Sequence, residues 1–326
     1  MKLEKLRIKN FKSIVDLELV NPSPFSVFVG PNGAGKSNIF EALEIAANSK
    51  SDDWRRLFGK KDELISYFSK DDFFEVIFKV EKRKSFTKRI EFPNDGVTQV
   101  RNKSSRGNED ESLRGEFNNF WLQRFSRIFV GNTRLVKLHF QDDLSLSLDA
   151  ANFKKVLKRI FQDGRKKDEF FEWVSLFVPE FENIEIHYDN ISGVDTFLIY
   201  EKFSRKPFTS NLISDGTINI FALLTAVFQS DEPQFLCIEE PENGLNPKVI
   251  KELVNFFRDA CEEKGHYIWL NTHSQTLVSQ LREEELILVD KIEGSTKIKQ
   301  FKSGDFYGLR ADEAWFTNVL GGGLPW

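Results

Sequence analysis

A glycine-rich stretch of eight residues constrains this chain more than any other part of its sequence. Residues Gly30–Ser37 read Gly-Pro-Asn-Gly-Ala-Gly-Lys-Ser, which matches the pattern Gly, any four residues, Gly-Lys and then Ser or Thr. The short apolar run Phe25–Val29 precedes the stretch and is typical of a β-strand. The segment Ile39–Ala47 follows it, with apolar residues at helical spacing. A strand, a glycine turn and a helix in this order predict a loop that cradles phosphate groups.

The residue types in this loop suit the binding of a nucleotide and a metal ion. Its glycines allow backbone NH groups to approach an anion, and the helix that follows adds its positive dipole end. Lys36 is expected to reach the β- and γ-phosphates, and the Ser37 hydroxyl is expected to hold Mg²⁺. The pattern therefore predicts ATP and Mg²⁺ as ligands. The residues expected to contact the nucleotide are Asn32, Gly33, Ala34, Gly35, Lys36, Ser37 and Asn38.

Charge and composition limit the other functions open to a chain of 326 residues. The formal net charge of -4 gives no overall attraction to nucleic acid, so any such binding needs a local basic surface. No apolar run approaches the roughly 18 residues that span a membrane, and the N-terminus does not lead into a signal-peptide core. The two cysteines, Cys237 and Cys261, have neither disulfide-framework nor zinc-site spacing. We therefore expect a cytoplasmic protein that does not associate with membranes.

Two adjacent glutamates end an apolar run in the second half of the chain. Phe235–Ile238 is continuously apolar, as in a parallel strand that is buried on both faces, and Glu239 and Glu240 follow it. Ligands of open α/β sheets bind at the carboxyl ends of the strands, so the pair is expected beside the phosphate loop. Neighbouring strand residues point to opposite faces and need not share a role. Glu239 is predicted to hold Mg²⁺, directly or through water, and Glu240 to polarise the attacking water.

Two further segments carry polar residues at places where a nucleotide site would need them. The apolar run Tyr267–Leu270 is followed by Asn-Thr-His-Ser, so His273 lies at the end of another candidate buried strand. A lone histidine is usually structural, yet its imidazole can donate a hydrogen bond in either protonation state. Upstream, the turn Leu212–Thr217 precedes the helical run Ile218–Phe228. This turn fits either an anion site at a helix start or a plain helix cap.

The middle of the chain carries no such motif but holds two basic stretches. From Lys79 to Arg106, nine basic residues (79, 82, 83, 84, 88, 89, 101, 103 and 106) stand against three acidic ones (81, 91 and 95). The second stretch, residues 154–167, is also basic. Together they form either a track for the phosphate backbone of double-stranded DNA or a solvated face. Two helices are predicted within Ala151–Phe177, and a hairpin of strands is predicted over Glu182–Tyr188 and Val194–Glu201.

The N-terminal sequence adds a resemblance to a known family. Leu6–Ser13 reads Leu-Arg-Ile-Lys-Asn-Phe-Lys-Ser and stands shortly before the phosphate loop, and the other motifs follow in order. This arrangement resembles the RecF, SMC and OLD-type ABC ATPases over residues 1–50 and 208–326. It implies an α/β fold: an ABC-type P-loop NTPase with N-terminal antiparallel strands, a parallel core sheet, and an inserted mixed α/β lobe over residues 51–207.

The same resemblance implies roles for individual residues. Lys12 takes the place of a basic residue near the nucleotide, and His273 takes that of a switch histidine at the γ-phosphate. Glu239 stands where the family usually has Asp, and Asp215 stands where its signature motif has the first Gly. In this family a second molecule completes the site, which implies a head-to-tail homodimer. The residues that would act across such a dimer are Ser214, Asp215, Gly216 and Asn246.

The sequence therefore predicts an ATP hydrolase in which Lys36, Glu240 and His273 are catalytic. ATP binding would close the dimer and hydrolysis would reopen it, acting on DNA or on an effector protein encoded nearby. Family members by resemblance serve in DNA repair and in defence against phages, and the sequence holds no His-Asn-His nuclease run. The alternative is a nucleotide-dependent interaction module that hydrolyses ATP negligibly and restrains a partner effector.

Two other interpretations fit less well, and a few details stay open. A membrane transporter subunit would usually keep Leu-Ser-Gly-Gly in its signature, and a phosphotransferase leaves the glutamate pair unexplained. The glutamine that the family uses between nucleotide site and lobe has three candidates, Gln99, Gln123 and Gln141. Two edge strands are predicted at Glu285–Asp290 and Lys297–Phe301. The segment Ala314–Trp326 resembles the ending of bacterial ATPases with an AAA_21-like domain.

Overall fold

The computed structural model describes residues 2–48, 61–81, 84–91, 99–104, 124–131, 143–189, 194–209 and 212–322. Its strands are β1 (Leu3–Phe11), β2 (Ile14–Val20), β3 (Phe25–Val29), β4 (Phe73–Val80), β5 (Lys84–Glu91), β6 (Gln99–Ser104), β7 (Phe125–Ile128), β8 (Phe181–Asp189), β9 (Val194–Glu201), β10 (Phe208–Thr209), β11 (Phe235–Glu239), β12 (Tyr267–Thr272), β13 (Leu286–Ile292) and β14 (Ser295–Gln300). Its helices are α1 (Lys36–Asn48), α3 (Lys61–Leu64), α5 (Phe153–Ile160), α6 (Gly164–Phe177), α7 (Asp215–Phe228), α8 (Pro247–Lys264), α9 (Gln275–Val278), the 3₁₀ helix η5 (Glu283–Glu285) and α10 (Ala311–Phe316). Within these ranges no helix is long and apolar enough to cross a membrane.

A mostly parallel sheet forms the centre of the molecule. Its strand order is β14-β13-β3-β12-β11-β7, and only β14 runs antiparallel to its neighbour. Every residue of β3 and β11 is buried, which explains why these strands are continuously apolar rather than alternating. Because the strands run parallel, the carboxyl ends of β3, β11 and β12 meet at one edge of the sheet. The predicted parallel core sheet is confirmed.

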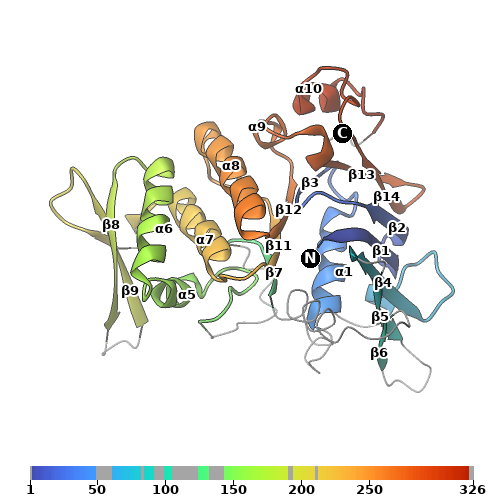
Figure 1. Ribbon diagram of the computed structural model, residues 1–326, viewed down its shortest axis with the longest axis horizontal. Coiled ribbons are helices and arrows are strands. Elements are labelled where there is room, and N and C mark those ends of the chain that lie inside the picture. The colour runs from blue at the N-terminus through green and yellow to red at the C-terminus, as the bar shows by residue number, and fades with distance from the viewer. Residues whose placement is uncertain are drawn as a thin grey trace.

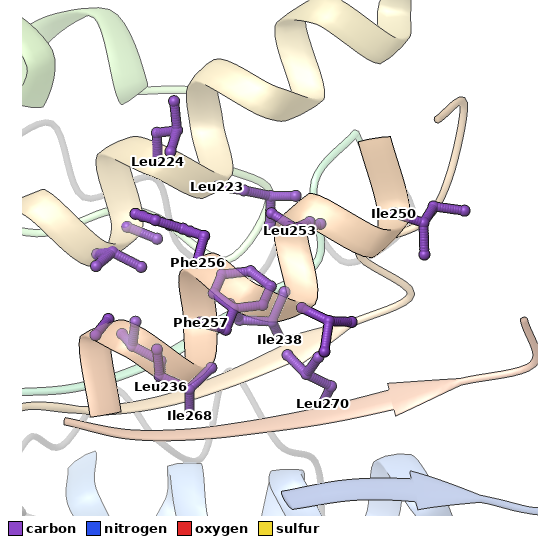
Figure 2. Packing of buried hydrophobic residues seen from close by; sticks show 14 of the residues in the cluster. Leu223, Leu224, Leu236, Ile238, Ile250, Leu253, Phe256, Phe257, Ile268 and Leu270 are labelled. Carbon is purple, nitrogen blue, oxygen red and sulfur yellow. The ribbon is translucent and has the colours of Figure 1, made fainter. Parts of the chain in front are cut away.

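The two faces of this sheet are covered by different elements. Helix α1 lies between the central sheet and the N-terminal sheet, whereas α7 and α8 cover the opposite face (Figure 1). Side chains alternate accordingly: Leu236 and Ile238 of β11 pack under α7 and α8, and Cys237 between them faces α1. Figure 2 shows Phe256 and Phe257 of α8 packed above these strands.

The middle of the chain contributes to three parts of the structure. Strands β4, β5 and β6 extend the N-terminal sheet in the order β2-β1-β4-β5-β6, all antiparallel. Strand β7 instead pairs with β11 at the edge of the central sheet. Helices α5 and α6 and the small sheet β10-β9-β8 pack beside α7 (Figure 1). The division at residues 50 and 208 stays a prediction; the described strands β4 to β7 of this segment lie in two sheets together with strands from outside it.

Several predicted elements are confirmed and one pair is corrected. The two helices within Ala151–Phe177 and the hairpin that ends at Glu201 are present as α5, α6, β8 and β9. The two C-terminal strands were both expected at a sheet edge. Only β14 lies there, because β13 also pairs in parallel with β3. An exposed edge and a central position cannot be distinguished from a short apolar run alone.

A buried polar network lies at the amino-terminal ends of strands of the central sheet. Gln229, at the end of α7, donates hydrogen bonds to the Ser126 hydroxyl (3.3 Å) and to the side-chain oxygen of Gln234 (3.0 Å). Gln234 in turn donates to the carbonyls of Ala226 and Val227. His266 is fully buried beside it, and its Nδ1 accepts from the Gln234 backbone N–H at 3.4 Å. Burial, with the nearby positive charge of Lys264, lowers the pKa of His266 to about 4.

This low pKa predicts a pH dependence of stability that a His266→Gln variant should remove. Above pH 6.5 the histidine is neutral in both states, whereas between pH 6.5 and 4 only the unfolded chain binds the proton. The free energy of unfolding should therefore fall by about 3 kcal/mol across that window, at about 1.4 kcal/mol per pKa unit. Urea titrations of wild type, His266→Gln and the exposed control His187→Gln measure the difference. A wild-type pH slope in His266→Gln would contradict the prediction.

Candidate active site

A pocket of about 230 Å³ opens where the carboxyl ends of β3, β11 and β12 meet the amino end of α1. Its lining consists of Asn32, Gly33, Gly35, Lys36, Ser37, Asn38, Glu240, Asn271 and His273. All of these residues except Asn271 were singled out in the sequence. Residues from three segments far apart in the chain are thus brought to one site by the parallel order of the strands.

The phosphate loop is held from outside by a threonine of β14. Thr296 Oγ1 donates a hydrogen bond to the Ala34 carbonyl (2.8 Å) and contacts the Ser13 hydroxyl (2.7 Å). The Ser13 hydroxyl in turn accepts a hydrogen bond from the Asn38 side chain. Gly35 has a φ of +103°, and a Cβ there would lie 2.1 Å from Thr296 Oγ1. The loop therefore needs glycine at this position both for its backbone conformation and for its close packing.

Lys36 lies inside the loop that precedes it. Its Nζ donates hydrogen bonds to the carbonyls of Gly30 (2.8 Å) and Pro31 (3.0 Å). Burial lowers the pKa of Lys36 to about 8, and the negative charges of Glu240 and Glu239 oppose this effect. The ammonium group is therefore still charged at neutral pH. A bound phosphate would place a negative charge beside it and so offset the cost of its burial.

Ser37 and Glu239 meet directly at the end of β11. The Ser37 hydroxyl donates a hydrogen bond to Glu239 Oε2 at 2.6 Å, and Asn271 Nδ2 donates to the same oxygen at 3.2 Å. A hydroxyl and a carboxylate oxygen are the ligands that Mg²⁺ takes from protein while it keeps several waters. Because these two oxygens already lie side by side next to the phosphate loop, the donor set fits Mg²⁺. When bound there, the metal would neutralise charge on the phosphates.

The other oxygen of Glu239 is held by a residue that the sequence analysis did not identify. Arg127 of β7 donates from Nε to Glu239 Oε1 at 2.6 Å and from Nη1 to Glu44 Oε2 of α1 at 2.9 Å. Burial opposes the charge of Arg127, but the carboxylates of Glu239 and Glu44 together raise its pKa. A single arginine in a short strand gives no motif, so only the three-dimensional structure reveals it.

Glu240 turns away from the strand into the pocket. Its φ of +47° is unusual for a residue other than glycine, and its backbone N–H donates to the Asn271 carbonyl at 3.0 Å. Its carboxylate accepts a hydrogen bond from Asn243 Nδ2 at 3.1 Å. The backbone turn at this point separates the two glutamates, so Glu239 faces Ser37 and Glu240 faces the open pocket.

His273 lies at the rim of the pocket, held by a second residue that the sequence analysis missed. Its backbone N–H donates to Glu242 Oε1 at 3.2 Å, and the Thr272 hydroxyl donates to the same oxygen. Partial burial and the positive charge of Lys36 lower the pKa of His273. Its imidazole is consequently neutral at pH 7 and has one N–H available to donate.

The remaining predicted residues lie outside this pocket. Lys12 forms an ion pair with Glu41, one turn along α1 from Ser37, at 2.5 Å, so a direct contact with nucleotide stays a prediction. Ser214 caps α7 by accepting from the Thr217 N–H. Asp215 begins that helix, and Asn246 caps α8. A role of these residues across a dimer also stays a prediction. Of the glutamine candidates, Gln123 and Gln141 lie outside the described residues, and Gln99 begins β6.

The turn Leu212–Thr217 before α7 and the loop that follows Glu240 contact each other within one chain. A Cβ added to Gly216 would lie 2.3 Å from the Gly244 carbonyl oxygen, so only glycine fits there. One turn further, Asn219 donates hydrogen bonds to the carbonyls of Pro241 (3.1 Å) and Asn243 (2.8 Å). The start of α7 is therefore packed against the segment that carries Glu240.

The strand order, the phosphate loop at α1 and the glutamate pair at β11 agree with the predicted fold of an ABC-type P-loop NTPase. The model of one protein family, described as "AAA domain, putative AbiEii toxin, Type IV TA system", matches residues 25–279, and the chain belongs to that family.

Individual relatives match shorter segments. The chromosome partition protein Smc of Methanocaldococcus jannaschii is 56% identical over 41 residues, which is 13% of this chain and 4% of that protein. RecF of Citrifermentans bemidjiense is 41% identical over 51 residues, 16% of this chain and 14% of the relative. The transporter ATP-binding protein EcfA2 of Mycoplasma pneumoniae is 31% identical over 163 residues, 49% of this chain and 48% of the relative. The matches span less than half the length of each relative.

Two solved structures resemble nearly the whole chain. The Smc head bound to the C-terminal winged-helix domain of ScpA has a TM-score of 0.64 at 18% identity, and covers 93% of this chain and 99% of that one. An Smc head with an extended coiled coil, from Pyrococcus furiosus, has a TM-score of 0.61 at 16% identity, and covers 98% of each chain. These likenesses confirm the predicted fold.

The packing of Gly35 predicts that Gly35→Ala weakens nucleotide binding more than Gly33→Ala. Both glycines have positive φ angles, but nothing lies within 4 Å of a Cβ at Gly33, whereas one at Gly35 would overlap Thr296. Gly35→Ala should lower affinity for a fluorescent ATP analogue at least about tenfold, which corresponds to roughly 1.4 kcal/mol. Gly33→Ala carries only the backbone strain and serves as the control. Equal affinities of the two variants would contradict the close packing at Gly35.

Proposed function

We propose that this chain is a Mg²⁺-dependent ATP hydrolase of the cytoplasm. In this proposal ATP binding brings two copies together head to tail, and hydrolysis separates them. The cycle would act on double-stranded DNA or on a partner effector protein, in DNA repair or in defence against phages. The observation that carries the hydrolase part is the position of Glu240, which lines one pocket with Lys36 and His273.

The chemistry follows from the charges and donors around this pocket. Glu240 is the carboxylate that faces the open space, where it can accept a proton from a water attacking the γ-phosphate. Lys36 and the loop N–H groups would balance the charge on the phosphates, and neutral His273 would donate its N–H to the γ-phosphate. Mg²⁺ would be held by Ser37 and Glu239.

The size of the pocket supports the dimer. Its volume of about 230 Å³ falls below the roughly 300–1,000 Å³ of pockets that enclose a whole small molecule, and it is open on one side. One chain thus provides a binding site for the phosphates and leaves the rest of the nucleotide partly uncovered. In the proposed dimer, a second copy would complete the enclosure with Ser214, Asp215, Gly216 and Asn246.

A Glu240→Gln variant tests hydrolysis and closure together. The amide cannot accept a proton from water, so turnover should fall at least about a hundredfold, within the range expected for loss of a general base. ATP binding should persist, and the variant should accumulate as a dimer with ATP and Mg²⁺. Phosphate release and the mass in solution measure the two effects. The exposed Glu263→Gln on α8 is the matched control and should behave as wild type.

The outcomes separate the hydrolase from the interaction module. If wild-type turnover is negligible and Glu240→Gln changes neither turnover nor mass, the hydrolase proposal fails. The chain would then be a nucleotide-dependent module that binds a partner in one nucleotide state.

The described charges favour the second basic stretch over the first as a DNA surface. In the first, Lys79 pairs with Glu4 at 3.2 Å and Arg89 pairs with Glu75 at 2.9 Å, so their charges are already balanced. In the second, Lys166 pairs with Asp231 at 2.6 Å, but Lys155 of α5 and Arg165 of α6 are exposed. Phosphate binding by such residues would be independent of sequence and sensitive to salt.

Reversing these two charges tests the DNA part of the proposal. Double-stranded DNA should raise wild-type turnover, and Lys155→Glu/Arg165→Glu should abolish that rise. The slope of log affinity against log salt should also shrink by about two, because two side chains would no longer neutralise DNA phosphates. Lys291→Glu/Lys302→Glu makes the same charge change at other exposed positions and is the control. Unchanged turnover with DNA in the wild type would exclude the DNA part and leave the partner protein.

A further inference from the structure

Arg127 occupies a buried position between three elements of the active site. It lies on β7, where it pairs in register with Cys237 of β11, two residues before Glu239. Its side chain is 6% exposed, and that of Glu239 is 3% exposed. From this position it contacts Glu239 at the end of β11 and Glu44 on α1.

The two oxygens of Glu239 have different partners. Oε1 accepts from Arg127 Nε at 2.6 Å and also contacts the Nη2 group. Oε2 accepts from Ser37 at 2.6 Å and from Asn271 at 3.2 Å. Because Oε1 is held by Arg127, the carboxylate cannot turn to offer both oxygens to a metal ion. Oε2 is therefore the oxygen that faces the site predicted for the metal.

The geometry of arginine explains how this is achieved. The guanidinium group is planar, and its N–H donors point in several directions within that plane. Nε and Nη2 can therefore bond Glu239 while Nη1 bonds Glu44. A buried carboxylate without a partner would be costly, and the pairing offsets that cost. The ammonium group of lysine lacks this fork and cannot bond both carboxylates in the same plane.

We infer that Arg127 is a positioning residue for the metal of the active site, which fixes Glu239 so that Oε2 points to Ser37 and to Mg²⁺. The inference rests on the proposed function, because that metal would arrive with the nucleotide. Arg127 itself contacts neither nucleotide nor metal in this assignment. Residues that orient a metal ligand commonly change metal affinity by about ten- to a hundredfold when they are replaced.

The experiment measures Mg²⁺ dependence of nucleotide binding rather than turnover. A fluorescent, non-hydrolysable ATP analogue is held at a fixed concentration with the full chain while free Mg²⁺ is varied, and binding is also measured with a chelator. In Arg127→Met the Mg²⁺ concentration for half-maximal binding should rise about ten- to a hundredfold. Binding without metal should stay within about twofold of wild type, because the phosphate loop and Lys36 are untouched.

A neighbouring arginine provides the matched control. Arg124 precedes the same strand and pairs at 3.7 Å with Glu232, whose side chain is largely exposed. Arg124→Met removes an equal charge from the same region and should keep the wild-type Mg²⁺ dependence. If Arg127→Met does not fold, Arg127→Lys carries the test, since it keeps a cation but loses the fork; its Mg²⁺ midpoint should also rise.

The outcomes separate this inference from the proposed function. If wild type does not bind the analogue with or without Mg²⁺, the proposed function fails and the inference fails with it. If wild type binds and the folded variants keep its Mg²⁺ midpoint, only the inference is overturned. A loss of metal-free binding as large as the loss with Mg²⁺ would also overturn it, because it would indicate general damage to the pocket.

Discussion

The carboxylate of Glu239 connects parts of the chain that lie far apart in the sequence. One of its oxygens is bonded to Ser37 at the start of α1 and to Asn271 in β12, and the other is bonded to Arg127 in β7. Since a buried charge is costly without such partners, the burial of Glu239 favours the assembly of these four segments. Glu239 thus links the helix that follows the phosphate loop to three strands of the central sheet, in addition to the bond from Thr296 to the loop itself.

The fold makes this concentration of charge possible. The apolar strands β3, β11 and β12 are covered on one face by α7 and α8 and on the other by α1, so their interiors need no polar partners. Two groups of polar residues lie at opposite ends of these strands. The amino-terminal edge holds the network of Gln229, Gln234 and His266, and the carboxyl-terminal edge holds the pocket. Burial by several layers also provides the low-dielectric surroundings in which the charges at the pocket act strongly.

The parts of the site that follow from local patterns could be predicted from the sequence, and the parts that depend on long-range packing could not. The loop at Lys36, the glutamate pair and His273 were found because each follows an apolar strand, and parallel strands place such residues at one edge. Arg127 was missed because nothing near it in the sequence distinguishes it from a surface arginine. The pairing of β4 with β1 was missed for a related reason: a strand's sequence does not specify which free edge it joins. The sequence analysis assigned no role to Glu242, whereas in the structure its carboxylate accepts a hydrogen bond from the backbone of His273.

The contact between α7 and the loop after Glu240 bears on how two sites of a dimer would communicate. Gly216 lies against the Gly244 carbonyl, and Asn219 donates hydrogen bonds to the carbonyls of Pro241 and Asn243, so a shift of the start of α7 would disturb the segment that follows Glu240. If Ser214 and Gly216 contact nucleotide on a second copy, the binding of that nucleotide bears directly on the position of Glu240 in the first. In the proposed dimer, closure over one nucleotide would then act on Glu240 at the other nucleotide through this packing and two hydrogen bonds.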